Sequence, residues 1–265
     1  MIAFFLQIVG AEAWRELRRM RAYPFDFLAD QTLFLIGFLL LSGLFQVVAE
    51  GDYTKEAQLA SLVGFLTWRA ADGCLLRTVN GLTDDAQWGT LEQVWLSGLL
   101  PRLIFIARSI VIFISYVIRV LIIAVILIIL LGLSPHYPFG VALVFFFTQI
   151  GVFGVAYMIV GFHLVYKSVA AMTMAFSTAL LFVTGALAPL SEGTILYSVS
   201  RFLPLAAGIS LLQEMIVFGT SFEKIVEDPN FYWLLATTFA YGIAGWVVMG
   251  WGQRIARRHG SLAHY

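Results

Sequence analysis

Residues 104–133 read IFIARSIVIFISYVIRVLIIAVILIILLGL, and this stretch carries only two charged residues, Arg108 and Arg119. A helix crosses the ~30 Å hydrocarbon core of a bilayer with about 20 mostly apolar residues. The stretch is continuously apolar, whereas a strand of an outer-membrane barrel alternates apolar and polar residues. It therefore predicts a membrane-spanning helix and an all-α integral membrane fold.

The composition agrees with this prediction. Of the 265 residues, 60% are hydrophobic and 12% are charged, whereas soluble domains are about half apolar and a quarter charged. This excludes a soluble enzyme, a disordered tail and a nucleic-acid binder. The single cysteine, Cys74, excludes an intramolecular disulfide and a cysteine-rich metal site. We expect one transmembrane domain over residues 1–265.

Five stretches qualify as spans by length and apolarity, and a sixth is weaker. The weak candidate contains Arg69, Asp72 and Arg77, which lower its hydropathy. The predicted spans are residues 25–48, 58–82, 104–133, 139–162, 168–188 and 231–252.

The basic residues predict the orientation of these spans. Four arginines lie within residues 15–21 and three within residues 254–258. Cytoplasmic segments carry an excess of Lys and Arg, so both termini, including a tail over 253–265, are expected in the cytoplasm. An even number of spans is then required, which favours 58–82 as the sixth. The expected location is the inner (plasma) membrane.

Two further segments are apolar without reading as spans. Residues 1–24 predict an amphipathic helix, either lying on anionic headgroups or acting only as a positively charged anchor. Residues 189–218 are interrupted by Glu192, Arg201, Pro204 and Glu214. They predict two short helices that dip in from the outer face and meet near Pro204; the alternative is one helix on the surface.

The motifs of several enzyme classes are missing from the sequence. There is no GxxxxGK[ST] phosphate loop, no HExxH and no GxSxG. The four histidines are scattered along the chain. We therefore expect no ATPase activity, no metal site and no cofactor in this chain.

Residues 83–101, TDDAQWGTLEQVWLSGLLP, predict a short helix over 84–98 in the first cytoplasmic loop. Asp84 and Asp85 are suited to cap its N-terminus, where a negative charge is also favourable. Gly98 and Pro101 end the pattern. Its apolar residues recur at three- and four-residue spacing: Trp88, Leu91, Val94 and Trp95.

This segment resembles the first coupling helix of ABC-2 type permeases, the membrane subunits of bacterial ABC exporters. The GTLEQ core of that helix is matched by Gly89, Thr90, Leu91, Glu92 and Gln93. Ser97 and Pro101 resemble its stop signal, although three residues separate them here. Residues 1–24 are similar to the family's elbow helix, and residues 185–218 to its extracellular re-entrant segment.

The resemblance implies a transporter with a separate ATPase subunit in two copies, which binds ATP and Mg, and a second permease chain, expected to be identical. ATPase coupling is implied for Asp85, Trp88, Gly89, Thr90, Leu91, Glu92, Gln93 and Trp95, with His163 and Lys167 as a second contact. A re-entrant gate is implied for Pro189, Arg201, Pro204 and Glu214. The cargo would be a drug, a lipid or another amphipathic compound. The alternatives are a glycan export permease, an ion-coupled secondary transporter and a membrane scaffold.

Charged residues at membrane depth usually face the interior of a helix bundle. They are Arg69, Asp72, Arg77, Arg108 and Arg119. We expect Asp72 to pair with Arg69 or Arg119, and Asp26 or Asp30 to pair with Arg77 or Arg108. Arg119 either lines a substrate path and prefers an anionic headgroup or is paired structurally.

Glycines in two of the spans predict close helix contacts, because small residues allow backbones to approach. Gly151, Gly154 and Gly161 lie in the fourth span, and Gly37 and the pair Ser42–Gly43 lie in the first.

Overall fold

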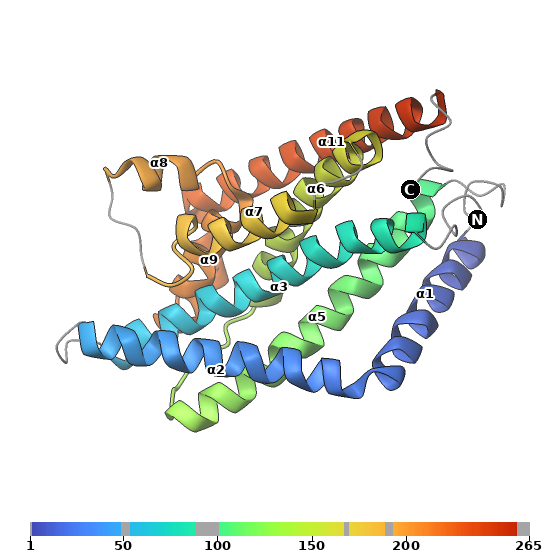
Figure 1. The fold of residues 1–265 in the computed structure, drawn as a ribbon. Coiled ribbons are helices and arrows are strands. Elements are labelled where there is room, and N and C mark those ends of the chain that lie inside the picture. The colour runs from blue at the N-terminus through green and yellow to red at the C-terminus, as the bar shows by residue number, and fades with distance from the viewer. Residues whose placement is uncertain (1, 49–53, 88–100, 167–169, 189–192, 259–265) are drawn as a thin grey trace.

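The computed structural model describes residues 2–48, 54–87, 101–166, 170–188 and 193–258, and this part of the chain is helical without strands (Figure 1). Five helices are long and apolar enough to cross a membrane. They are α2 (Pro24–Val48), α3 (Lys55–Gln87), α5 (Pro101–Leu131), α6 (Val141–Tyr166) and α11 (Pro229–Arg258). The predicted all-α class is confirmed for these residues, and the length and composition of the five helices suggest a multi-pass membrane protein.

Five shorter or differently placed helices complete the described part of the chain. They are α1 (Ile2–Ala22), α7 (Ala170–Val183), α8 (Ile195–Ser200), α9 (Pro204–Val217) and α10 (Phe222–Glu227). Helix α1 leaves the start of α2 at a steep angle (Figure 1). The bend falls at Tyr23–Pro24, where proline suits the first position of a helix.

Helix α3 is the centre of the bundle. In its membrane-length apolar window 94% of the residues are buried, against 11% in α2. It contacts α2, α5, α6, α7 and α9. A segment of weak hydropathy can therefore form the central helix, because its charged side chains meet protein groups and not lipid.

The predicted span over 168–188 is represented by a shorter helix. Helix α7 has 14 residues, which corresponds to roughly 21 Å at 1.5 Å per residue. It runs antiparallel beside α3: Trp68 Nε1 donates to the Ser177 carbonyl at 2.8 Å, and Ser61 Oγ donates to the Leu187 carbonyl at 2.7 Å.

Residues 193–218 form two helices, so the alternative of a single surface helix is wrong. Pro204 is the first residue of α9. Helix α9 is buried against α3, α6 and α11, with Leu205, Leu211 and Leu212 at most 1% exposed. Its interior position keeps its backbone among protein groups.

Two predicted boundaries are wrong. Helix α3 continues through Asp84 and Asp85 to Gln87, so this pair does not cap a new helix. The remaining residues of the predicted coupling helix, 88–98, lie outside the described part of the chain. Helix α11 continues to Arg258, so residues 253–258 are helical and do not begin a tail.

The glycines of α6 make the predicted close contacts. A Cβ atom at Gly161 would lie 2.5 Å from the Val248 carbonyl oxygen of α11, and one at Gly154 would lie 2.5 Å from the Tyr241 carbonyl group. Gly151 packs in the same way against Pro204. In the first span the prediction holds only at Ser42, which is buried and accepts a hydrogen bond from Gln58 of α3 at 2.9 Å. Gly37 and Gly43 have nothing within 4 Å of an added Cβ atom in this chain.

Candidate functional site

Four charged residues form a closed ring that joins α1, α3 and α5. Arg108 of α5 lies 2.7 Å from Asp85 of α3 and 3.5 Å from Glu12 of α1. Arg15 closes the ring, 2.7 Å from Glu12 and 3.7 Å from Asp85. Arg108 and Asp85 are 5% and 7% exposed. We refer to these four residues as the charged ring.

Two members of the charged ring flank the segment 88–100 in the sequence. Asp85 is in the last turn of α3, before this segment, and Arg108 is two turns into α5, after it. The buried contact between them therefore ties together the two helices that the segment connects.

A second set of ion pairs connects α2, α3 and α5. Asp30 of α2 lies 2.6 Å from Arg69 of α3 and 3.3 Å from Arg119 of α5. Arg69 also lies 3.3 Å from Asp72, which accepts a hydrogen bond from Ser177 of α7. The Arg69 guanidinium stacks on Phe34, 3.5 Å from the ring centroid.

The same network reaches α1 through Glu16. This carboxylate lies 2.7 Å from Arg19, 3.6 Å from Arg77 and 3.9 Å from Arg119. Burial alone would raise the pKa of Glu16, but the hydrogen bond from Arg19 and the charges of three arginines outweigh it, so the pKa is lowered below 4.5. We call the connected set the ion-pair belt: Glu16, Arg19, Asp30, Arg69, Asp72, Arg77, Asp84 and Arg119.

One of the two predicted pairings is confirmed and the other is wrong. Asp72 pairs with Arg69 as expected. Asp30 pairs with Arg69 and Arg119 and not with Arg77 or Arg108.

Arg77 and Arg108 each contact an aspartate near the end of α3, Asp84 and Asp85 respectively, and also a glutamate of α1. Glu16 contacts Arg77, and Glu12 contacts Arg108. These two glutamates are four residues apart and so share a helix face. That spacing was the signal in the sequence for an acidic face of α1 that binds buried arginines.

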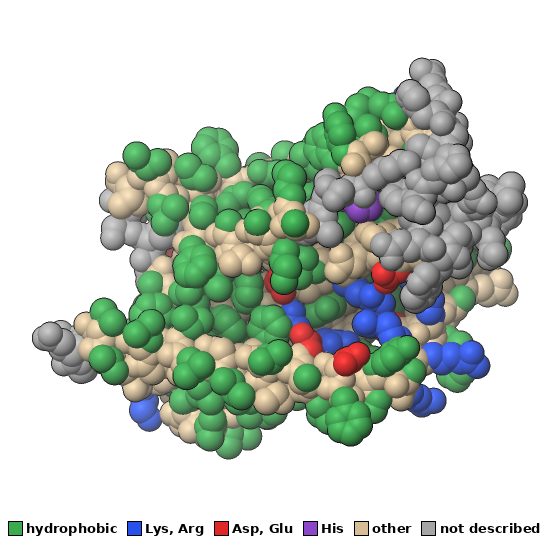
Figure 2. All heavy atoms as spheres, viewed as in Figure 1, with side chains coloured by type: hydrophobic (Ala, Val, Ile, Leu, Met, Phe, Trp, Pro, Cys, Tyr) green, Lys and Arg blue, Asp and Glu red, His purple; other side chains and the backbone are tan. Residues whose placement is uncertain are grey.

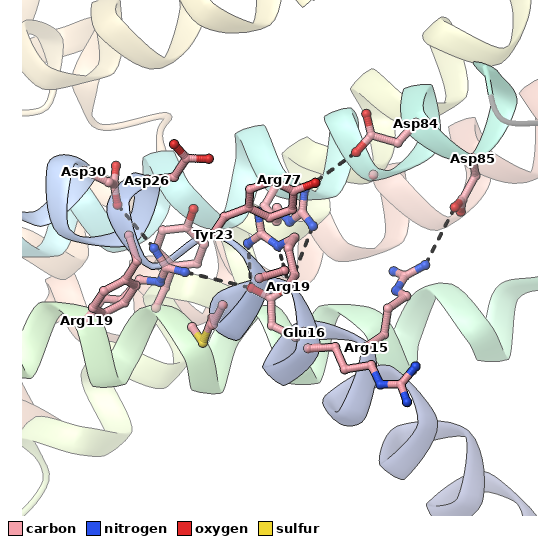
Figure 3. Close-up of a pocket in the computed structure, with 16 residues that line it drawn as sticks. Arg15, Glu16, Arg19, Tyr23, Asp26, Asp30, Arg77, Asp84, Asp85 and Arg119 are labelled. Carbon is pink, nitrogen blue, oxygen red and sulfur yellow. Dashed lines mark hydrogen bonds and ion pairs between the residues drawn. The ribbon is translucent and has the colours of Figure 1, made fainter.

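A cavity of about 620 Å³ lies among α1, α2, α3 and α5, beside the ion-pair belt (Figure 3). We call it the α1–α3 pocket. Its charged lining residues are Arg15, Glu16, Arg18, Arg19, Asp26, Asp30, Arg77, Asp84, Asp85 and Arg119. On the face shown in Figure 2, acidic and basic side chains gather in one area bordered by hydrophobic surface.

A smaller cavity of about 290 Å³ lies at the other end of the bundle, where α8, α9 and α11 meet. Two predicted gate residues, Arg201 and Glu214, line it. The Arg201 carbonyl accepts a hydrogen bond from Trp233 Nε1 at 2.5 Å. Burial, reinforced by the charge of Asp228, raises the pKa of Glu214. Pro189 lies outside the described residues.

The predicted coupling contacts are only partly visible. Trp88, Gly89, Thr90, Leu91, Glu92, Gln93, Trp95 and Lys167 lie outside the described part of the chain. His163 is 1% exposed within α6, with Nε2 3.2 Å from Thr83 Oγ1. The imidazole is therefore buried within this chain, and its contact with a partner subunit stays a prediction.

Within the described residues, no three His, Cys, Asp or Glu side chains are grouped so that they could hold a metal ion. No family model matches the chain, and no curated protein aligns with it significantly. Any assignment of function therefore depends on the residues and the geometry given above.

Glu16 makes the stability of the α1 contact depend on pH. Because the folded-state pKa of Glu16 is depressed, its stabilising contribution is present above pH 4.5 and is lost as the pH falls through the folded value. We expect Glu16→Gln to lower the melting temperature at pH 7 and the difference from wild type to shrink below pH 4.5. Thermal unfolding in detergent measures this.

The matched control for Glu16 is Asp26→Asn. Asp26 is exposed and has no ion pair among the described residues, so this variant should melt like wild type at every pH. A Glu16→Gln deficit that is absent at pH 7, or that persists unchanged at pH 3, would contradict the assignment.

Proposed function

We propose that the chain is the permease subunit of an ATP-driven ABC-2 type exporter that moves a drug, a lipid or another amphipathic compound. The single observation that carries the proposal is the buried 2.7 Å contact between Asp85 and Arg108. It binds together the helices on either side of residues 88–100, which contain the GTLEQ match. A soluble ATPase pressing on that segment would move three helices as one unit.

A topology of six crossings is part of the proposal, and contacts along α3 support it. His163 of α6 lies beside Thr83, Ser177 beside Trp68, and Leu187 beside Ser61. From Thr83 to Ser61, α3 rises roughly 33 Å at 1.5 Å per residue. The described contacts at residues 163, 177 and 187 are thus spread along α3 over a length comparable to the ~30 Å hydrocarbon core.

The position of the helix ends supports an orientation with both termini in the cytoplasm. Helix α1 and the C-terminal end of α11 lie at the same end of the bundle as the end of α3 (Figure 1). This end carries the arginines of α1 and α11. The positive-inside rule assigns it to the cytoplasm, so α8 and α9 would lie on the outer side as a re-entrant gate.

The paired carboxylates favour this proposal over an ion-coupled transporter. Asp30 and Asp72 each have an arginine within 3.3 Å. A carboxylate that carries a proton or a sodium ion must lose and regain that ion in each cycle, whereas these two are held by fixed positive charges. Their arrangement suits a rigid connection between helices.

The test is copurification followed by an activity measurement. Tagged chain isolated from its native membrane should bring an ATPase of separate sequence in equal amount, in complexes with two copies of each subunit. We expect Glu92→Ala to lower the ATPase rate of that complex at least fivefold, as a coupling free energy of about 1 kcal/mol or more would give.

Glu56→Ala is the matched control for Glu92→Ala. Glu56 is an exposed glutamate in the first turn of α3, at the opposite end from residues 88–100, and its loss should leave the ATPase rate unchanged. Recovery of the chain without any ATPase would overturn the proposal. An ATPase complex insensitive to Glu92→Ala would overturn the coupling role of the segment.

A further inference from the structure

The α1–α3 pocket combines a buried floor with an exposed rim. Arg119 and Glu16 are at the floor, with side chains 7% and 13% exposed. Asp84 and Arg15 are at the rim, with side chains 42% and 51% exposed. Its volume of about 620 Å³ is typical of cavities that bind small ligands, which occupy roughly 300–1,000 Å³.

Arg77, with a side chain 21% exposed, lines this pocket and makes no hydrogen bond to the described residues. Its guanidinium lies 3.6 Å from Glu16 and 3.7 Å from Asp84. Both distances exceed the range of a hydrogen bond, although a guanidinium carries five donors. The Nε atom of Arg119, at the pocket floor, is buried and has no hydrogen-bond partner among the described residues. Two arginines of one cavity therefore have donors for an oxyanion.

The acidic side chains of the pocket favour a ligand that also carries a positive charge. Five arginines and five carboxylates line the pocket, so its formal charge is zero. Asp26, on the first turn of α2, is exposed and has no ion pair among the described residues. A purely anionic ligand would be repelled by this carboxylate, whereas an ammonium group beside a phosphate would pair with it.

The surroundings of the pocket indicate a ligand with acyl chains. Asp26 is flanked by Phe25 and Leu28, which are 83% and 57% exposed. On α1, Trp14 and Leu17 are also about half exposed. Exposed apolar side chains on both helices that line the opening match the boundary between headgroups and hydrocarbon.

We propose that the α1–α3 pocket binds the headgroup of a zwitterionic phospholipid from the leaflet in which α1 lies. The phosphate accepts hydrogen bonds from Arg77, the ammonium group pairs with Asp26, and the acyl chains lie along the apolar side of α2. The inference goes beyond the proposed export function and stands without it, because it depends only on the pocket and its surroundings.

The test is lipid binding to delipidated full-length protein in detergent, counted by native mass spectrometry. The probes are phosphatidylethanolamine, phosphatidylglycerol, glycerophosphoethanolamine and inorganic phosphate. We expect phosphatidylethanolamine to bind at least fivefold more tightly than phosphatidylglycerol. The two probes without acyl chains should bind at least tenfold more weakly than phosphatidylethanolamine.

Two variants test the two charges of the headgroup. Arg77→Gln should weaken phosphatidylethanolamine binding about tenfold, as expected for a lost charged contact of about 1.4 kcal/mol. Asp26→Asn should bring it to the level of phosphatidylglycerol without weakening phosphatidylglycerol itself. Because Asp26 has no ion pair to lose, this variant keeps the test valid if Arg77→Gln fails to fold.

Arg21→Gln is the control for nonspecific attraction, since Arg21 is exposed on α1 and does not line the pocket. It should bind phosphatidylethanolamine within twofold of wild type. Equal affinity for the two lipids, or equal losses in Arg77→Gln and Arg21→Gln, would overturn the proposal. Inorganic phosphate or glycerophosphoethanolamine binding as tightly as the lipid would also overturn it, by showing that the ligand is a soluble phosphate compound.

Discussion

Arg108→Ala is expected to destabilise the protein by about 3–5 kcal/mol, the range for a buried ion pair that loses one partner. The substitution removes the 2.7 Å partner of Asp85, which is 7% exposed, and also the 3.5 Å partner of Glu12. The measurement is chemical unfolding in detergent. Arg21→Ala, a change at an exposed arginine of α1, should have little effect.

The double variant Arg108→Met/Asp85→Leu separates stability from coupling. Replacing both members of a buried pair by apolar residues of similar size is often neutral or stabilising, so this protein should regain most of the lost stability. It nevertheless lacks the charged ring. Under the proposed function, the ATPase rate of its complex should therefore be lower than that of wild type. Wild-type stability of Arg108→Ala would show that the ring does not hold α1, α3 and α5 together.

The central helix shows what the sequence could and could not predict. Hydropathy ranked residues 58–82 as the weakest span, and only the even number of crossings required by two basic termini favoured it. In the structure α3 is the most buried of the long helices. A scale of transfer into lipid underestimates such a helix, because Arg69 is paired with Asp72 and Asp30, and Asp72 also accepts a hydrogen bond from Ser177.

The missed ion-pair partners have a different cause. Arginines in apolar stretches show that partners must exist, but the sequence does not say which distant carboxylate is near. The interfacial prediction for α1 considered its arginines as ligands for lipid and left Glu12 and Glu16 without a role. The four-residue spacing of the two glutamates marks an acidic face of α1, but the packing of α1 against α5 decides which arginines that face meets.

Gly161→Ala is expected to destabilise the protein by about 3 kcal/mol, the upper part of the range for overpacking a tight contact. The added methyl group would lie 2.5 Å from the Val248 carbonyl oxygen and 2.9 Å from the Met249 amide nitrogen. Both atoms are backbone, so no side-chain rotation relieves the overlap and α11 must move away from α6. Thermal unfolding and the yield of folded protein in detergent measure the effect.

Gly43→Ala is the matched control and is expected to act in the opposite direction. Gly43 lies within α2 and has nothing within 4 Å of the added Cβ position, so the chain gains helix propensity of up to about 1 kcal/mol without a clash. The difference in stability between Gly161→Ala and Gly43→Ala therefore reports how closely α6 and α11 pack. If Gly161→Ala were as stable as Gly43→Ala, the two helices would have to lie farther apart than the backbone contact at Gly161 requires.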